Sequence, residues 1–367
     1  MEPLRYKRLL SQSELFQPAR NTYFEIGEGY DSHGTIADED IDDWVAREVR
    51  EHAWQIFAGV VASDGYSTVA SGGPKAAPVP KLPFSAKAFD RLVRDCKIPF
   101  QVLEMYPRYT NAGCVSKFTT FNEPSGKVGI IGFLLMMRLR TSITTTSALS
   151  HDPNTGITTG LIIRIVDDDS REIQAMLQHY RSLIGQPLLL TTILLDIGLY
   201  DSVRLSLETK ANLAFIELHT GQHTWSRIVA DRSSSTSPQD TTVGSLMKLA
   251  HGAKIEVAVA QRKSRVILSV SNFLQQLSGD PLYLSAPPMS SPQGNQQIKE
   301  WIDHLSSQAE MEAADVSFLL PRTENQISAV SQRADGNSAL ARGKRLISGT
   351  TYTVIQYLFS ARRRCNS

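Results

Sequence analysis

The sequence predicts an α/β or α+β fold, in which a mixed N-terminal domain is followed by a long-helix hairpin or stalk. Two observations predict it. Between residues 98 and 166, β-branched, aromatic and glycine residues form short apolar runs, which is typical of buried strands. Beyond residue 243, apolar side chains recur at steps of three and four residues along two segments, as in helices that pack along their length. The chain has 367 residues, enough for two domains with their own cores.

The N-terminal region, residues 1–81, is predicted to contain one helix over about 36–58 and then a flexible linker. Five of the six residues from Asp38 to Asp43 are acidic, and apolar residues follow them at helical spacing. Acidic side chains in a first turn complement the helix dipole, so we interpret this cluster as a helix start rather than a cation site. Residues 63–83 are rich in Gly, Pro, Ser and Ala, which is typical of a flexible connector.

Residues 82–230 are predicted to form the mixed α/β domain. Its first element is a short amphipathic helix over about 85–95, for which Ser85 is the expected cap. Four apolar runs bounded by Gly, Pro and Asn are expected to be strands: Phe100 to Tyr106, Val115 to Phe121, Val128 to Leu139 and Gly160 to Val166. One helix is expected directly after the last of them. Another is expected over about 187–209, with Pro187 in its first turn.

Three adjacent carboxylates, Asp167, Asp168 and Asp169, come directly after the last predicted strand. Hard cations take oxygen ligands, so these three side chains could bind Mg²⁺. The same residues fit the N-terminus of the following helix equally well, with Asp169 as its cap and Glu172 three residues further on. Both interpretations stay open, and Mg²⁺ is the cofactor to test here.

A second candidate metal site is the pair His219 and His223, whose spacing would place both imidazoles on one face of a helix. Gly221 between them, and the lack of a nearby Cys or of a Glu adjacent to His219, weigh against zinc. The sequence also lacks a Gly-x-Ser-x-Gly elbow, a Gly-x-x-x-x-Gly-Lys phosphate loop and a His-Glu-x-x-His motif. We therefore expect that the protein is not an enzyme, and a zinc hydrolase ranks last among the hypotheses.

Residues 243–334 are predicted to form the helical hairpin or stalk. Apolar residues keep helical spacing over about 243–278 and again over about 295–334, with a Pro/Ser/Gly loop over 281–294 between them. Two long helices joined by a short loop favour an antiparallel arrangement. Pro321 should kink the second helix or mark a boundary there. The apolar row is interpreted as core or, alternatively, as a seam for self-association or for a partner protein.

The last region, residues 335–367, is interpreted as a basic tail. From Arg322 to the end, eight Lys and Arg residues stand against two acidic ones. This excess could favour anionic lipid or RNA, but a solvated, disordered tail is the preferred interpretation. The uncharged run from Leu346 to Ala361 is shorter and more polar than a typical membrane-spanning helix.

The composition favours a cytoplasmic location, with the basic tail as the segment that would associate with a membrane. A net charge of +1 gives no reason to expect nucleic acid as a partner. Cys96, Cys114 and Cys365 are too scattered for a disulfide framework or a Cys-x-x-Cys pair, which is typical of a reducing compartment. The N-terminus has no apolar core of a secretory signal, and no Asn-x-Ser/Thr sequon occurs.

Three phrases of the sequence are similar to the fungal CorA-like transporter-domain proteins, which are distant relatives of CorA-type magnesium transporters. They are LPFSAKAFDRLVRDCKIPF (Leu82 to Phe100), GQPLLLTTILLDI (Gly185 to Ile197) and LLPRTENQISAVSQ (Leu319 to Gln332). With the order of the predicted elements, the resemblance covers roughly residues 82–334. It implies a cytoplasmic α/β domain that leads into a long stalk helix. In that family, two membrane helices follow the stalk, and oligomerisation forms the ion pore.

The Gly-Met-Asn signature of CorA-type channels, at the end of their first membrane helix, does not occur in this sequence, so no pore residue is carried over. The resemblance implies the soluble sensing or assembly part of a divalent-cation transporter-like protein, and no transport is expected from this chain alone. The alternative function is a soluble helical protein-interaction module that docks a partner or a second copy through its long helices.

Overall fold

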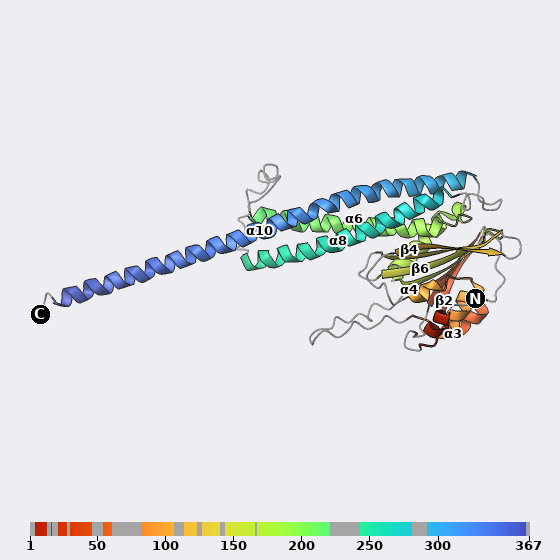
Figure 1. Cartoon of the computed structure of the whole chain (residues 1–367), viewed down its shortest axis with the longest axis horizontal. Coiled ribbons are helices and arrows are strands. Elements are labelled where there is room, and N and C mark those ends of the chain that lie inside the picture. The colour runs from red at the N-terminus through yellow and green to blue at the C-terminus, as the bar shows by residue number, and fades with distance from the viewer. Residues whose placement is uncertain are drawn as a thin grey trace. The chain divides into compact units, whose positions relative to one another are not determined.

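The computed structural model describes most of the chain (Figure 1). The described residues are 4–12, 16, 21–27, 30–45, 54–60, 82–105, 114–122, 127–139, 144–165, 167–220, 243–280 and 292–364. The chain divides into two compact units. Unit 1 consists of Met1–Val203 and Arg262–Ala313, and unit 2 of Arg204–Gln261 and Ala314–Ser367.

Strands and short helices make up the first half of the chain and long helices the second (Figure 1). The strands are β1 (Asn21–Gly27), β2 (Tyr30–Ile36), β3 (Trp54–Val60), β4 (Cys114–Asn122), β5 (Lys127–Arg138), β6 (Thr144–His151) and β7 (Thr158–Ile165). The helices are α1 (Leu4–Leu10), α2 (Ile41–Val45), α3 (Ala86–Asp95), α4 (Gln101–Met105), α5 (Asp167–His179), α6 (Leu189–Thr220), α8 (Val243–Ser278) and α10 (Pro292–Arg364). The 3-10 turns η2 (Asp38–Asp40) and η4 (Arg181–Leu183) precede α2 and α6.

One mixed sheet of seven strands forms the centre of unit 1, in the order β2-β1-β3-β7-β6-β5-β4. Strands β3 and β7 are parallel, and all other neighbours are antiparallel. The β3–β7 pair therefore joins the N-terminal strands to the later ones. Among the strands that the structure describes, β4 is the last on its side of the sheet.

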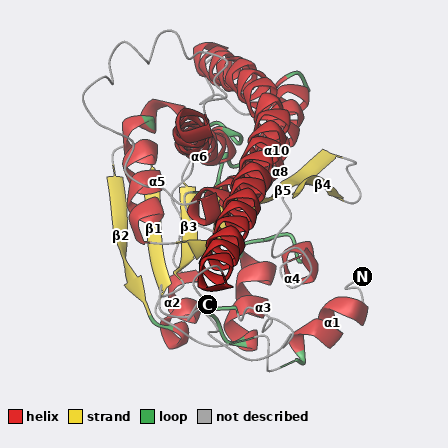
Figure 2. Cartoon of the chain, turned by 90° about the vertical axis from the view of Figure 1, so that its left-hand side faces the viewer, coloured by secondary structure: helices red, strands yellow, loops and turns green. Residues whose placement is uncertain are grey.

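Both faces of the sheet are covered, as strand β5 shows: its side chains are buried in one core on one face and in a second core on the other. Ile131, Phe133, Leu135 and Met137 belong to a core shared with α5, α6, α8 and α10. Leu134 faces the opposite core, shared with α1, α2, α3 and α4; Figure 2 shows these four helices gathered on one side of the strands. A strand buried on both faces has a continuous apolar run rather than an alternating one.

The predicted fold class is confirmed, since a mixed α/β region is combined with long helices. The strands expected over 115–121, 128–139 and 160–166 are β4, β5 and β7, and the helix expected over 243–278 is α8. Ser85 caps α3 as predicted, because its hydroxyl accepts the backbone N–H of Ala88 at 3.0 Å.

The prediction of one helix over 36–58 was wrong, because the structure has η2, the five-residue helix α2 and then strand β3 in that range. β3 forms ladders with β1 on one side and β7 on the other. Hydrogen bonds on both edges override a weak helical spacing. Residues 1–81 therefore contribute three strands to the common sheet rather than a separate region.

The prediction of a strand over 100–106 was also wrong, since residues Gln101–Met105 form helix α4. The turn begins where the N–H of Val102 bonds to the carbonyl of Pro99 at 3.1 Å. Proline presets the backbone angle of a first helical turn. Val102 and Leu103 are then buried among the N-terminal helices.

The basic region 335–364 is helical rather than a disordered tail, because α10 runs unbroken to Arg364 with Pro321 inside it. Extending an existing helix costs less than nucleating a new one, which favours continuation from the packed segment. In unit 1, α8 and α10 are antiparallel, as expected. Ser271 Oγ bonds to Ser306 Oγ at 2.5 Å, and Gln275 bonds to Asp303 at 3.4 Å.

Three helices rather than two form the core of unit 2. Leu213 and Ile216 of α6 pack with apolar residues of α8 and α10 in one cluster. The predicted hairpin is thus one part of a three-helix arrangement, whose third member is the helix expected over 187–209 and observed to run on to Thr220.

Candidate functional site

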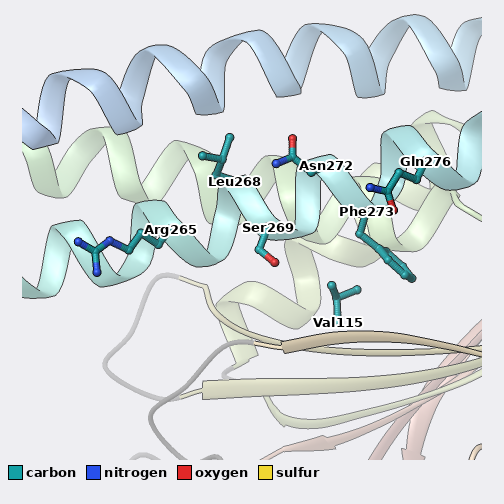
Figure 3. Close-up of a pocket in the computed structure, with 7 residues that line it drawn as sticks. All are labelled: Val115, Arg265, Leu268, Ser269, Asn272, Phe273 and Gln276. Carbon is teal, nitrogen blue, oxygen red and sulfur yellow. The ribbon is translucent and has the colours of Figure 1, made fainter.

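A groove of about 470 Å³ lies between α8 and the edge strand β4 in unit 1 (Figure 3). Six lining residues come from α8: Arg265, Leu268, Ser269, Asn272, Phe273 and Gln276. Ser269 and Phe273 point toward Val115 of β4, whereas Leu268 and Asn272 lie on the side of α8 away from the strand. The volume is within the range of pockets that bind small ligands and short peptide segments.

The groove has an apolar floor and a polar rim. Val115, Leu268 and Phe273 are partly buried and pack against the helical core. Arg265, Ser269, Asn272 and Gln276 are exposed along the same helix face. Amide side chains both donate and accept hydrogen bonds, so the rim can pair with either kind of polar group on a ligand.

The two ends of the groove differ in charge. Beyond Gln276, Asp280 accepts a hydrogen bond from Lys117 of β4 at 2.8 Å, which neutralises both charges. At the other end, Arg265 lies one helical turn from Arg262. Burial and the nearby Arg262 lower the pKa of Arg138, the last residue of β5. This end of the groove therefore carries a positive field.

A buried ion pair anchors α8 next to the positive end of the groove. Lys263 donates to the carboxylate of Asp201 on α6 and to the backbone carbonyl of Leu139. Only 5% of the lysine side chain and 7% of the aspartate side chain are exposed. The pair fixes α8 against α6 and the end of β5, so that Arg262 and Arg265 on either side of Lys263 point away from the core.

The predicted Mg²⁺ residues lie in the first turn of α5, which begins at Asp167. The helix starts three residues earlier than a cap at Asp169 requires, and Asp169 is buried with 1% exposure. The side chains of Asp167 and Asp168 lie outside the described set. Among the residues that the structure does describe, no group of three or more His, Cys, Asp or Glu side chains is arranged to hold a metal ion. The Mg²⁺ site therefore stays a prediction.

Only one histidine of the predicted zinc pair, His219, lies in the part of the chain that the structure describes. His219 is near the end of α6, where its Nδ1 lies 2.8 Å from the carbonyl oxygen of Phe215. Its ring also packs against that of Phe215, with the ring centroids 4.2 Å apart and the planes tilted by 38°. His223 lies outside the described residues, so the zinc hypothesis is not tested by this geometry.

In unit 2, ion pairs join α6 to α10. Arg322 donates two hydrogen bonds to Glu217, at 2.5 and 2.7 Å, and this bonding raises the pKa of the arginine. Lys210 donates to Asp315 at 2.7 Å. Bidentate arginine–carboxylate pairs are both stronger and more directional than single contacts.

Large apolar residues are exposed beside these ion pairs, and we refer to them as the apolar face of unit 2. They are Leu207, Phe215 and Leu218 of α6 and Phe318 of α10. Phe318 is 73% exposed and lies between Asp315 and Arg322, the two residues of α10 that pair with α6.

Sequence reasoning missed the groove. It placed Val115 in a strand and residues 265–276 in a helix, and both assignments are confirmed. The available signal was the polar row Arg265, Ser269, Asn272 and Gln276 on one helix face. Nothing in the sequence shows that this face lies over an edge strand.

No protein-family model matches the sequence, and no curated protein matches it. Among solved structures, the soluble domain of CorA from Methanocaldococcus jannaschii is 10% identical, with a TM-score of 0.45 over 84% of this chain and 96% of that one. Full-length CmaX is 9% identical, with a TM-score of 0.46 over 89% and 81% of the two chains. The cytoplasmic domain of ZntB from Vibrio parahaemolyticus is 9% identical, with a TM-score of 0.44 over 86% and 100%.

Within the described part of the chain, the helices contain no stretch that is long and apolar enough to cross a membrane.

Proposed function

We propose that this chain is the soluble assembly part of a divalent-cation transporter-like protein of the CorA-like type. The proposal starts from the sequence resemblance over residues 82–334, and the observation that carries it is the length of α10. The last buried residues among its described side chains are Ala329 and Val330, but the helix continues to Arg364. That continuation adds a rise of about 50 Å. A single helix of 73 residues is suited to act as a stalk.

The apolar face of unit 2 supports the assembly role. Leu207 is 57% exposed and Phe318 is 73% exposed, although both lie on helices with well-packed opposite faces. Clustered large apolar residues on a soluble surface mark places where another protein surface binds. We assign this face to a second copy of the same chain, because the proposed function requires self-association.

The first experiment measures self-association of the full chain by sedimentation and light scattering over a range of concentrations. The double substitution Leu218→Asp and Phe318→Asp should raise the dissociation constant at least about tenfold, because it places charges in an apolar contact. Ile255→Asp is the matched control, since Ile255 is 68% exposed on α8, outside the apolar face. A wild-type chain that remains monomeric at every concentration contradicts the assembly role.

The second experiment tests cation sensing at Asp167, Asp168 and Asp169. A cation that binds only the folded state stabilises it, so about 10 mM Mg²⁺ should raise the melting temperature by about 2 to 4 °C. Replacing all three residues by Asn should abolish this increase, while the exposed triple control Glu39→Gln, Asp40→Asn and Asp43→Asn should retain it. The magnesium-dependent increase is compared, rather than the basal melting temperature, because the Asn variant also weakens the helix start. An equal increase in both triple variants rules out the proposed site.

Three further expectations belong to the same proposal: a cytoplasmic location, membrane association through residues 335–367, and no transport by this chain alone. Carbonate extraction of membranes from cells that express the chain measures the association. Reconstitution into vesicles that contain a magnesium indicator measures transport.

The second candidate function is a soluble interaction module with no transport role. The groove between α8 and β4 favours it, because the groove offers a binding surface that a stalk does not need. A monomeric chain with no response to Mg²⁺ would leave this function as the better supported one.

A further inference from the structure

The groove combines an open strand edge with a helix face that carries polar groups. Strand β4 pairs only with β5 in the described part of the sheet, so its other edge is free to accept a strand there. Val115 on β4 faces Ser269 and Phe273 of α8 across the groove (Figure 3). An unpaired strand edge presents backbone N–H and carbonyl groups to any extended chain that reaches it.

We propose that this groove binds an extended peptide segment that carries an acidic side chain, with the peptide backbone added to the free edge of β4. The inference is independent of the assembly role, because it uses no residue of the apolar face of unit 2.

The dimensions favour a short extended peptide. From Arg265 to Gln276 the helix rises about 16 Å. An extended chain rises about 3.3 Å per residue, so about five residues span the groove. Successive side chains of a strand point to opposite sides, so alternate residues would contact the apolar side chains of Val115 and Phe273.

The charges favour an acidic residue near the start of β4. Arg262 and Arg265 are both exposed there, and neither guanidinium forms an ion pair within the part of the chain that the structure describes. Burial lowers the pKa of Arg138 at this corner of the sheet, and the positive charge of the nearby Arg262 lowers it further. A carboxylate is the group that two free guanidiniums recognise through paired hydrogen bonds.

The amides favour a peptide over a small anion. Asn272 and Gln276 lie one and two turns beyond Ser269, away from the arginine end. A free phosphate or carboxylate bound at Arg265 would not reach them. A peptide backbone offers a donor and an acceptor at each residue, which matches the paired capacity of amide side chains.

The test uses the full chain and a set of fluorescent pentapeptides in which aspartate or glutamate alternates with Val, Ile, Leu, Phe or Thr. The matched set has lysine at each acidic position. We expect members of the acidic set to bind, with the lysine set at least about tenfold weaker. Arg265→Glu should abolish binding of the acidic set, and Lys248→Glu, a charge reversal at an exposed residue of the same helix, should leave it unchanged. Hydrogen exchange should slow at backbone amides of β4 when peptide is present.

Three results overturn the proposal. The first is no binding by any acidic peptide up to about 1 mM, which is weaker than specific peptide recognition. The second is equal loss of binding in the Arg265→Glu and Lys248→Glu variants, which indicates general charge attraction. The third is complete displacement by inorganic phosphate with no slowing of exchange in β4, which identifies an anion site alone.

Discussion

At the scale of single residues, His151 makes the folding stability of unit 1 depend on pH. It is the last residue of β6, it is 1% exposed, and its Nδ1 lies 2.9 Å from the hydroxyl of Thr158 at the start of β7. Burial lowers its pKa to about 4, against a smaller opposing effect of Asp152. The imidazole is therefore neutral in the folded protein at pH 7.

Protonation of His151 is predicted to destabilise the protein as the pH falls. Between pH 6.5 and 4 the unfolded chain binds a proton that the folded chain does not, so the stability present above pH 6.5 is lost through this range. This residue should account for about 2 kcal/mol of the loss between pH 7 and pH 5. Urea denaturation of His151→Gln should show a shallower pH dependence than the wild type. His304→Gln, at an exposed histidine, is the control, and equal slopes in all three proteins contradict the prediction.

Residue-level reasoning from sequence succeeded where the interaction is local. The Ser85 cap depends only on the backbone N–H of Ala88, three residues away, and a serine before a helix is by itself a recognisable cap. The cap at Asp169 was misplaced because three consecutive aspartates offer the same chemistry at three positions. The burial of Asp169 depends on the tertiary packing of α5, which residue types alone do not encode.

At the scale of elements, the Lys263–Asp201 pair joins α8, α6 and the end of β5. We expect Lys263→Met to cost about 3 to 5 kcal/mol of folding stability, because it leaves a buried carboxylate without its cation. The double variant Lys263→Met, Asp201→Leu should recover most of the loss, since an apolar pair leaves no buried charge.

The exposed pair Lys210–Asp315 provides the control for that prediction. Its aspartate side chain is 60% exposed, so Lys210→Met should cost less than about 1 kcal/mol. Denaturant unfolding of the four proteins gives all the values. A double variant as unstable as Lys263→Met would show that the bond to Leu139 contributes more than the charge pairing.

The elements that sequence analysis missed have a common physical cause. Strand β6, with the sequence TTTSALSH, is buried along its whole length but contains few large apolar residues, so no apolar run marks it. Strand β3 was assigned to a helix because its hydrogen-bond partners β1 and β7 are distant in sequence. The existence of the long helices was predicted, because their spacing repeats over many turns and one irregular residue changes little. The bounds of α8 were also right, but α6 and α10 continue beyond the predicted ends at 209 and 334, to Thr220 and Arg364.

At the scale of the whole molecule, the predicted order of an α/β part and a helical part is right, but the compact units are not consecutive stretches of sequence. Each unit is built from two separate segments. Residue patterns predict the elements within each segment. They do not predict which segments share a core, because that choice depends on contacts between residues more than a hundred positions apart, such as Glu217 with Arg322 in unit 2.

The parallel pairing of β3 with β7 also constrains how the protein is made. Trp54 lies opposite Thr158, so β3 has no partner on that side until roughly a hundred more residues have left the ribosome. During that interval β3 is paired with β1 on one edge and is open on the other, and an open strand edge can pair with other chains. The nascent protein therefore passes through a stage at which a chaperone that shields strand edges would raise the yield of native protein.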